Sequence, residues 1–271
     1  MSQRSASSDP IWKEWRLTAE ELARGAGQAV RQLLAQPRRL QSKGFRDIVT
    51  DADFAAQGLI TNGLRQRYPT HGFWAEEENP DLPANGPVRW LIDPVDGTSN
   101  YSRNIPNFCV SIAACVEELT VVGVIYDPMS DELFSAARGQ GCTVNGQPCT
   151  VSETDEITET FVAFDWGRQR SIRQRIVAAV PQFAHEVRNL RSFGSTALTL
   201  AWVASGRLDA HLGLQLGAWD VAAGALLIEE AGGRVTTVDN TPLILMANTS
   251  CFSSNGRLHE ELLSLLRAPA G

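Results

Sequence analysis

The sequence predicts an α+β protein in which sheets lie between layers of helices. Segments with helical periodicity and short apolar segments typical of strands occur in both halves of the chain. Consecutive strand candidates at 107–149 interrupt this alternation, which indicates an antiparallel meander. The length of 271 residues is near the upper limit for one core. We therefore expect two closely joined halves, 1–149 and 150–271, in one compact unit.

In the first half, apolar residues at helical spacing predict a helix over 11–35, which Pro37 ends. A second helix is expected over 51–68, stopping before Pro69. The Asn145-Gly146 pair predicts a tight hairpin at the end of the meander. Strands are expected at 45–50, 72–78, 89–93, 110–116, 120–126 and 132–137.

The second half alternates again. Gly206 and Gly232 are placed to end helices, because glycine adopts the left-handed conformation at a helix C-terminus without strain. Strands are expected at 161–165, 186–191 and 208–212, and helices at 171–180, 195–206, 220–231 and 258–266.

Composition narrows the class of protein. A net charge of −7 argues against nucleic-acid or anionic-membrane binding through a basic field. The five cysteines form no C-x-x-C pair, which favours reduced thiols. The N-terminus lacks a signal-peptide core, and no run approaches the ~20 apolar residues of a membrane span. We expect a cytoplasmic enzyme.

The most informative segment is the turn in which an apolar run ends in Asp93 and Asp96. A strand that stops at Asp93 would deliver both carboxylates to one place, and Pro94 makes the following turn rigid. Gly97 lets the backbone approach closely, so the amides of Gly97 and Thr98 can face an anion. Oxygen ligands beside free amides suit a divalent cation and a phosphate held together.

Three further segments, 47–53, 73–78 and 217–224, place acids at element boundaries. Each has a structural alternative. Asp53 could complement a helix dipole, Asp220 could be a helix N-cap, and the acids at 76–78 could be a solvated charge run. The occurrence of all of them at element boundaries favours one shared site.

These motifs resemble the inositol monophosphatase family, within the Mg²⁺-dependent, Li⁺-sensitive phosphatase superfamily. The pattern D-P-x-D-G-T-x-N is matched at 93–100, and W-D-x-A-x-G followed by E-A-G-G is matched at 219–233. The entry motif D-x-V-T-x-x-D is matched at 47–53, and a G-S-x-A helix start at 194–197 only in part. The resemblance implies a layered α-β-α-β-α sandwich and a homodimer.

The resemblance also implies the roles of individual residues. Glu76, Asp93 and the Val95 carbonyl would bind a first Mg²⁺ ion, with Mn²⁺ as an alternative metal. Asp93, Asp96 and Asp220 would bind a second ion. Glu76, through waters, would help to hold a third.

Catalysis and substrate binding follow from the same resemblance. Asp53 and Thr98, with Glu76, would position and activate the attacking water, and the Gly97 and Thr98 amides would hold the phosphate. A substrate-side set is expected at Lys43, Gly194, Ser195, Thr196 and Gln215.

The charges agree with this chemistry, because a phosphate monoester dianion repels the attacking water's developing charge. The four carboxylates Glu76, Asp93, Asp96 and Asp220 carry −4 formally. Two Mg²⁺ ions would balance that charge, and three would leave +2, which matches the dianion. We therefore expect a third ion to arrive with the substrate.

One departure concerns the substrate. Inositol enzymes of the family usually carry a glutamate seven residues before the second-signature aspartate, where this chain has Gly213. Gln215 could substitute, and Arg168, Arg170 and Arg191 could serve a second anionic group or be plain surface charge.

The sequence therefore predicts Mg²⁺-dependent hydrolysis of a small sugar- or polyol-phosphate, with inositol monophosphate as the first candidate. The alternatives are fructose 1,6-bisphosphate, 3′-phosphoadenosine 5′-phosphate and histidinol phosphate, or a non-catalytic homologue. No cysteine or Ser-His-Asp arrangement is placed to supply a nucleophile. We expect His71, His185, His211 and His259 to be structural or solvated.

Overall fold

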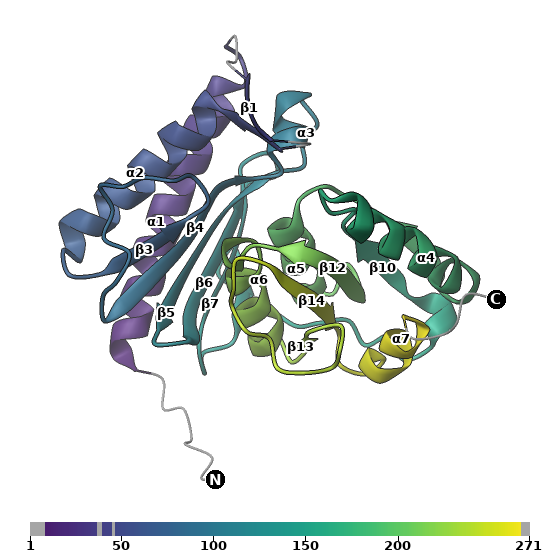
Figure 1. The fold of residues 1–271 in the computed structure, drawn as a ribbon. Helices are drawn as coiled ribbons and strands as arrows, with labels where there is room; N and C mark the ends of the chain where they lie inside the picture. The colour runs from purple at the N-terminus through teal and green to yellow at the C-terminus, as the bar shows by residue number, and fades with distance from the viewer. Residues whose placement is uncertain (1–8, 37–39, 45–46, 267–271) are drawn as a thin grey trace.

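The fold is that of a computed structural model (Figure 1). It describes residues 9–36, 40–44 and 47–266, except for the side chains of Lys43 and Asp47. The elements up to residue 149 are α1 (Pro10–Leu33), β1 (Leu40–Gly44), β2 (Asp47–Thr50), α2 (Asp51–Arg67), β3 (Gly72–Ala75), β4 (Val88–Asp96), α3 (Thr98–Ser102), β5 (Cys109–Val116), β6 (Leu119–Asp127), β7 (Glu132–Ala137), β8 (Cys142–Val144) and β9 (Gln147–Cys149). Those that follow are β10 (Phe161–Phe164), α4 (Arg170–Glu186), β11 (Asn189–Arg191), α5 (Thr196–Ala204), β12 (Ala210–Leu216), α6 (Ala218–Glu230), β13 (Arg234–Thr236), β14 (Thr249–Ser254) and α7 (His259–Leu265).

Two large sheets organise the molecule. The first has seven strands in the order β3-β4-β5-β6-β7-β8-β9, with only β3 and β4 parallel. The second has five strands in the order β11-β10-β12-β14-β13, with parallel pairing around β10. The first sheet therefore contains the predicted meander. The boundary near residue 150 stays a prediction.

Helices cover these sheets in three layers, as Figure 1 shows. α1 and α2 pack on the outer face of the first sheet, and α4 and α7 pack against the second. α5 and α6 lie between the sheets and contact strands of both. The predicted α-β-α-β-α sandwich is confirmed.

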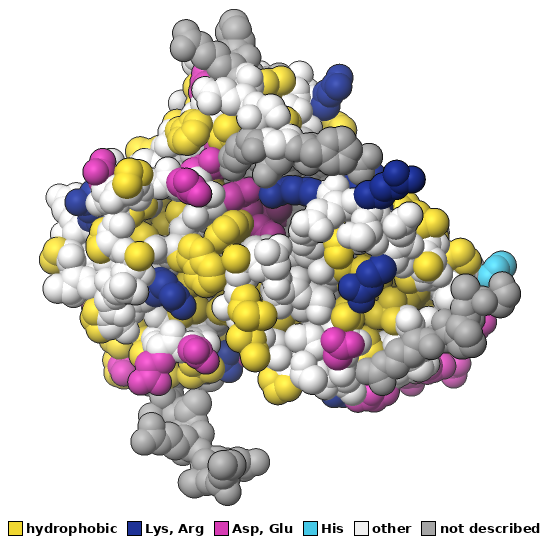
Figure 2. Space-filling view, viewed as in Figure 1, with side chains coloured by type: hydrophobic (Ala, Val, Ile, Leu, Met, Phe, Trp, Pro, Cys, Tyr) yellow, Lys and Arg dark blue, Asp and Glu magenta, His cyan; other side chains and the backbone are white. Residues whose placement is uncertain are grey.

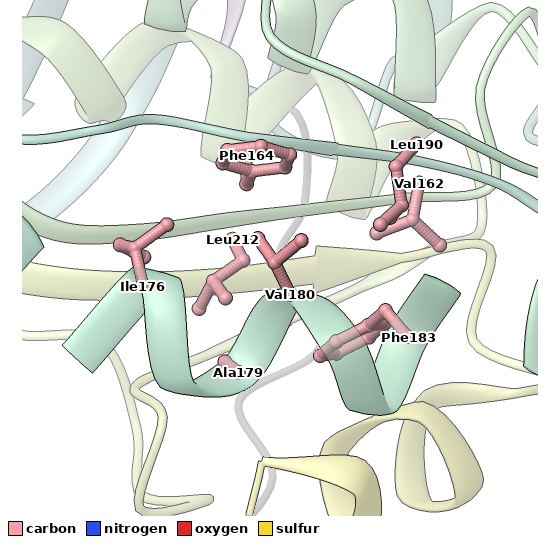
Figure 3. A pocket seen from close by; sticks show the side chains of 8 residues that line it. All are labelled: Val162, Phe164, Ile176, Ala179, Val180, Phe183, Leu190 and Leu212. Carbon is pink, nitrogen blue, oxygen red and sulfur yellow. The ribbon is translucent and has the colours of Figure 1, made fainter. Parts of the chain in front are cut away.

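Apolar clusters fill the spaces between the layers. The largest surrounds α5 and α6, a second lies under α1 and α2, and a third lies between α4, α7 and the second sheet. The third cluster leaves a narrow pocket under α4 (Figure 3), lined entirely by apolar side chains from Val162, Phe164, Ile176, Ala179, Val180, Phe183, Leu190 and Leu212. This pocket offers no group for catalysis or metal binding.

Several predicted boundaries are wrong, and two of these involve a proline. β4 does not stop at Asp93 but continues through Pro94 to Asp96, because a bulge between these aspartates absorbs the missing N–H of proline. α4 does not end at residue 180 but includes Pro181 and reaches Glu186. Pro181 frees the carbonyl of Val177, and the structure tolerates this because Val177 is exposed.

Other local expectations hold. Asn145 and Gly146 both have positive φ between β8 and β9, as a tight hairpin requires. Gly206 and Gly232, just after α5 and α6, also have positive φ. All five cysteines are free. Among the described residues, no helix is both long and apolar enough to cross a membrane.

Candidate active site

Three carboxylates from distant elements converge in the structure. Asp93 and Asp96 come from the end of β4, and Asp220 comes from the first turn of α6. One carboxylate oxygen from each residue lies within 4.8 Å of the other two. The structure thus brings together residues that are more than 120 positions apart in the chain.

The bulge in β4 explains why Asp93 and Asp96 lie together. Residues three apart on a regular strand point to opposite faces of a sheet. Here Asp93 is opposite Ser111 and Asp96 is opposite Cys109, which lie only two residues apart on β5. The extra residue on β4 therefore turns both aspartates to the same face.

Hydrogen bonds hold one oxygen of each carboxylate. The Val95 amide donates to Asp93 Oδ1 at 3.0 Å, and the Gly217 amide donates to Asp220 Oδ2 at 2.7 Å. Asp96 Oδ2 accepts from the Ser195 hydroxyl at 2.7 Å and the Ala197 amide at 2.6 Å. Each residue keeps a second oxygen, and three fixed carboxylate oxygens suit a hard divalent cation.

Burial and mutual repulsion disfavour charge in this cluster. Burial, helped by the neighbouring Glu76, raises the pKa of Asp93 well above its usual range. Burial likewise raises the pKa of Asp220, and it raises that of Asp96 to about 6. Three such acids stay ionised together only when positive charge is supplied. The residues present therefore fit a metal centre.

A cavity of about 530 Å³ opens beside the cluster and is lined by residues of both large sheets, among others. Figure 2 shows acidic and basic side chains meeting in a hollow of the surface. Glu76 lies on this wall directly after β3, outside the group of three carboxylates. Its Oε1 accepts a hydrogen bond from Arg168 at 3.5 Å.

A hydroxyl–carboxylate pair lies behind the cluster. Thr98 Oγ1 lies 3.2 Å from Asp53 Oδ1 and 3.0 Å from the Val95 carbonyl. Asp53 is fully buried and also caps α2, because Thr50 donates to it through both its amide and its hydroxyl. Burial raises the pKa of Asp53 to about 6. Asp53 therefore lies in the first turn of α2, as the helix-dipole alternative expects, and it also contacts the Thr98 hydroxyl.

Gly97 makes the turn that leads from β4 to Thr98. Its φ is +102°, and a Cβ there would lie 2.9 Å from the Asn107 carbonyl oxygen. Only glycine fits this position without strain. Among the described residues, the amides of Gly97 and Thr98 have no hydrogen-bond acceptor, and both residues line the cavity.

The predicted substrate-side residues separate into groups. Gly194, Thr196 and Gln215 line the cavity. Ser195 instead lies behind Asp96, 1% exposed, as the N-cap of α5. Lys43 belongs to β1, but its side chain lies outside the described residues.

Of the three arginines considered, only Arg168 lines the cavity. Arg191 instead donates to its near neighbours Asn189 and Leu190. Arg173 joins Arg168 on the wall and was not predicted there.

A side chain at position 213 would require Leu216 to move. A Cβ on Gly213 would lie 2.5 Å from Leu216 Cδ1 and 3.2 Å from His211 Cε1. The carboxylate on this side of the cavity comes from Asp165, which follows β10. Sequence reasoning missed Asp165, although an acid directly after a predicted strand is the same signal that singled out Glu76 and Asp93.

Comparison with known proteins agrees with the sequence motifs. The family model described as "Inositol monophosphatase family" matches residues 12–269. The chain belongs to the inositol monophosphatase family. Members of this family are phosphomonoesterases, so the chain is an enzyme that acts as a phosphatase.

The similar proteins include some named as inositol monophosphatases and others named as SuhB. Inositol monophosphatase 2 from Solanum lycopersicum is 36% identical over 255 residues, which cover 92% of this chain and 96% of that protein. Nus factor SuhB from Escherichia coli (strain K12) is 38% identical over 221 residues, which cover 80% and 83%. The SuhB structure from Bartonella henselae matches with a TM-score of 0.89 at 32% identity, covering 94% of this chain and 98% of that one.

Proposed function

We propose that this inositol monophosphatase family member hydrolyses a small sugar- or polyol-phosphate monoester, with inositol monophosphate as the first candidate, in an Mg²⁺-dependent reaction. The observation that carries the proposal is the convergence of Asp93, Asp96 and Asp220 on one wall of a cavity. The Thr98–Asp53 pair adjoins that wall.

We propose the metal ligands that the family resemblance implies. Glu76, Asp93 and the Val95 carbonyl would hold one Mg²⁺ ion, and Asp93, Asp96 and Asp220 a second. Mg²⁺ bound there would neutralise the ester's charge and lower the pKa of water. Mn²⁺ has similar ligand preferences and is expected to replace it.

Proton transfer is assigned to Thr98 and Asp53. The Thr98 hydroxyl lies between the cavity and the buried Asp53 carboxylate. It can accept a proton from the attacking water while it passes its own to Asp53. The amides of Gly97 and Thr98 would hold the phosphate in line with that water.

The charge of the site predicts how many Mg²⁺ ions it binds, and this number can be measured. The carboxylates of Glu76, Asp93, Asp96 and Asp220 total −4, so a third Mg²⁺ ion would give the site the +2 that complements a dianion. Calorimetric titration should show phosphate binding tightly only with three metal equivalents. Tight phosphate binding with two equivalents would refute the third ion.

A substrate panel tests the function itself. Phosphate release with Mg²⁺ should be fastest from inositol 1-phosphate, compared with fructose 1,6-bisphosphate, 3′-phosphoadenosine 5′-phosphate and histidinol phosphate. Faster turnover of another ester would reassign the substrate and leave the class intact. No release from any ester would favour a non-catalytic homologue.

The remaining expectations concern the cellular location, the oligomeric state and the binding partners. We propose a cytoplasmic homodimer that binds neither nucleic acid nor membranes. The net charge of −7 supports the last two points. Phe54 and Leu59 on α2 are about half exposed, which is compatible with a protein contact there. Light scattering coupled to size-exclusion chromatography would measure the oligomeric state.

A further inference from the structure

We propose that Asp165 binds a hydroxyl group of the leaving alcohol and gives the site its preference for polyhydroxylated esters. The inference rests on the proposed phosphatase function, and it names the group that distinguishes one ester from another. Asp165 lies directly after β10 and lines the cavity that contains the three-carboxylate cluster.

Two donors hold one oxygen of this carboxylate. Asp165 Oδ2 accepts from the Thr196 hydroxyl at 2.8 Å and lies 2.7 Å from His211 Nε2. Within the described part of the chain, Oδ1 has no hydrogen-bond partner. A carboxylate fixed at one oxygen and open at the other is prepared to accept a hydrogen bond from a ligand.

His211 is arranged to orient Asp165. Its side chain is fully buried, and its Nδ1 has no partner among the described residues. The favoured tautomer therefore carries its proton on Nε2, because a proton on Nδ1 would be a buried donor without an acceptor. In that tautomer Nε2 donates to Asp165 and fixes the rotamer of the carboxylate.

One helix turn couples Asp165 to the metal cluster. Ser195 and Ala197 donate to Asp96, while Thr196, between them, donates to Asp165. The position of the open Asp165 oxygen is therefore fixed relative to the cluster. A phosphate ester bound at the cluster would present its alcohol part to this wall.

The chemistry of the wall favours a hydroxyl over a second phosphate at Asp165. A carboxylate only accepts hydrogen bonds, so it attracts hydroxyl groups and repels an anion. The neighbouring Arg168 is paired with Glu76, which reduces the positive charge available on this side. Asp165 thus supplies an acceptor that position 213, occupied by glycine, cannot supply.

Asp165→Asn is the direct test because it conserves shape. Thr196 and His211 both donate to the same oxygen, so the carboxamide oxygen must take that place and its NH₂ group must face the cavity. We expect the KM for inositol 1-phosphate to rise about 10- to 100-fold with kcat changed little. Phenyl phosphate has no hydroxyl on its leaving group, so its KM should stay within about 2-fold.

Asp209→Asn is the matched control. Asp209 is a buried aspartate at the opposite end of β10, where its Oδ2 accepts from the Phe161 amide at 2.6 Å, and it does not line the cavity. We expect this variant to lose thermal stability without a change in KM for either ester. Should Asp165→Asn not fold, Thr196→Val should raise the same KM by a smaller factor.

The outcomes separate the two levels of the proposal. Wild-type hydrolysis of neither ester would refute the phosphatase function itself. Wild-type activity with equal KM changes for both esters in Asp165→Asn, or with no change, would refute the role of Asp165 alone. A larger KM increase for histidinol phosphate than for inositol 1-phosphate would mean that Asp165 binds an ammonium group, and would also overturn the hydroxyl assignment.

Discussion

At the scale of single residues, the site depends on carboxylates that have one oxygen fixed and one oxygen open. Asp93, Asp96, Asp220 and Asp165 all share this arrangement. The fixed oxygen removes rotamer freedom before any ligand binds, so the ordering cost of binding is reduced. Burial makes the ionised forms of Asp93, Asp96 and Asp220 unfavourable, and a bound cation would compensate for this free-energy cost.

Asp93→Asn should lower turnover at least roughly 100-fold while leaving the fold intact. The amide keeps an oxygen that can accept from the Val95 amide, and it removes one charge from a repulsive cluster. Phosphate release and thermal unfolding measure the two effects. Asp127→Asn is the control, because Asp127 is equally buried but accepts from the Met129 and Ser130 amides in a turn away from the cavity. More than a few per cent residual activity in Asp93→Asn would contradict a shared-ligand role.

At the scale of elements, the site residues lie at the ends of helices and strands and at irregularities within them. The β4 bulge aligns two aspartates, and the first turn of α5 holds Asp96 and Asp165 through consecutive residues. α6 places Asp220 in its own first turn, where the Gly217 amide donates to it. Regular segments of strand and helix supply rigidity, and their ends supply the ligands.

Ser195→Ala should weaken both the α5 cap and the metal centre. The Ser195 hydroxyl caps α5 and donates to Asp96, so we expect a loss of about 1 kcal/mol in unfolding free energy. Mg²⁺ affinity should fall about 10-fold, because a supporting hydrogen bond to a ligand is removed. Chemical denaturation and Mg²⁺ titration provide the measurements.

Asp9→Ala separates capping from metal binding. Asp9 caps α1 by accepting from the Ile11 amide, on an element that does not line the cavity. It should lose similar stability and keep its Mg²⁺ affinity. If both variants lost affinity equally, the assigned role of Ser195 would be wrong.

At the scale of the whole molecule, the site exists because α6 packs closely on the first sheet. A Cβ on Gly123 of β6 would lie 2.7 Å from the Ala223 carbonyl oxygen of α6. This backbone contact sets the distance between the helix that carries Asp220 and the sheet that carries Asp93 and Asp96. The geometry of the carboxylate cluster therefore depends on the packing of α6 against the first sheet.

Gly123→Ala should push α6 away from the sheet. We expect a loss of about 1–3 kcal/mol in unfolding free energy and weaker Mg²⁺ binding. Gly58→Ala in α2 is the control, because a Cβ there meets nothing within 4 Å and alanine favours a helix. It should stabilise the protein by about 0.5–1 kcal/mol without changing Mg²⁺ affinity. Unchanged Mg²⁺ binding in Gly123→Ala would show that the halves adjust independently.

The stabilisation that Mg²⁺ provides should depend on pH. Asp53 and Asp96 have folded-state pKa values of about 6, raised from 3.8 by burial. Their stabilising contribution is present below pH 3.8 and is lost as pH rises through 6. Mg²⁺ binds the ionised form of Asp96 and of the other ligands, so the increase in Tm that it causes should be larger at pH 8 than at pH 5, reaching about 5 °C or more.

The comparison of Mg²⁺ with a chelator at each pH is the appropriate measurement. Burial lowers the pKa of His259 to about 4, which destabilises the fold as pH falls below 6.5. That effect acts with and without metal, so the difference between the two melting curves removes it. A difference that is independent of pH would argue against the converging acids.

Most helices and strands were predictable because periodicity and turn chemistry act over a few residues. The Asn145-Gly146 hairpin and the glycines after α5 and α6 are of this kind. The strands β1, β13 and β14 and the single-turn α3 were missed. β14 pairs with the distant strand β12, so its placement is not set by its own pattern alone. β1, β13 and α3 are too short to show a clear periodicity.

The residues by themselves determined the family, the acids at element boundaries and the glycine that turns the chain toward Thr98. Only the tertiary structure decided that a bulge puts Asp93 and Asp96 on one face, that Ser195 supports Asp96 and that His211 orients Asp165. The physical reason is one of range. Backbone preferences are set by neighbours in the chain, whereas convergence of side chains is set by how layers from different parts of the chain pack together.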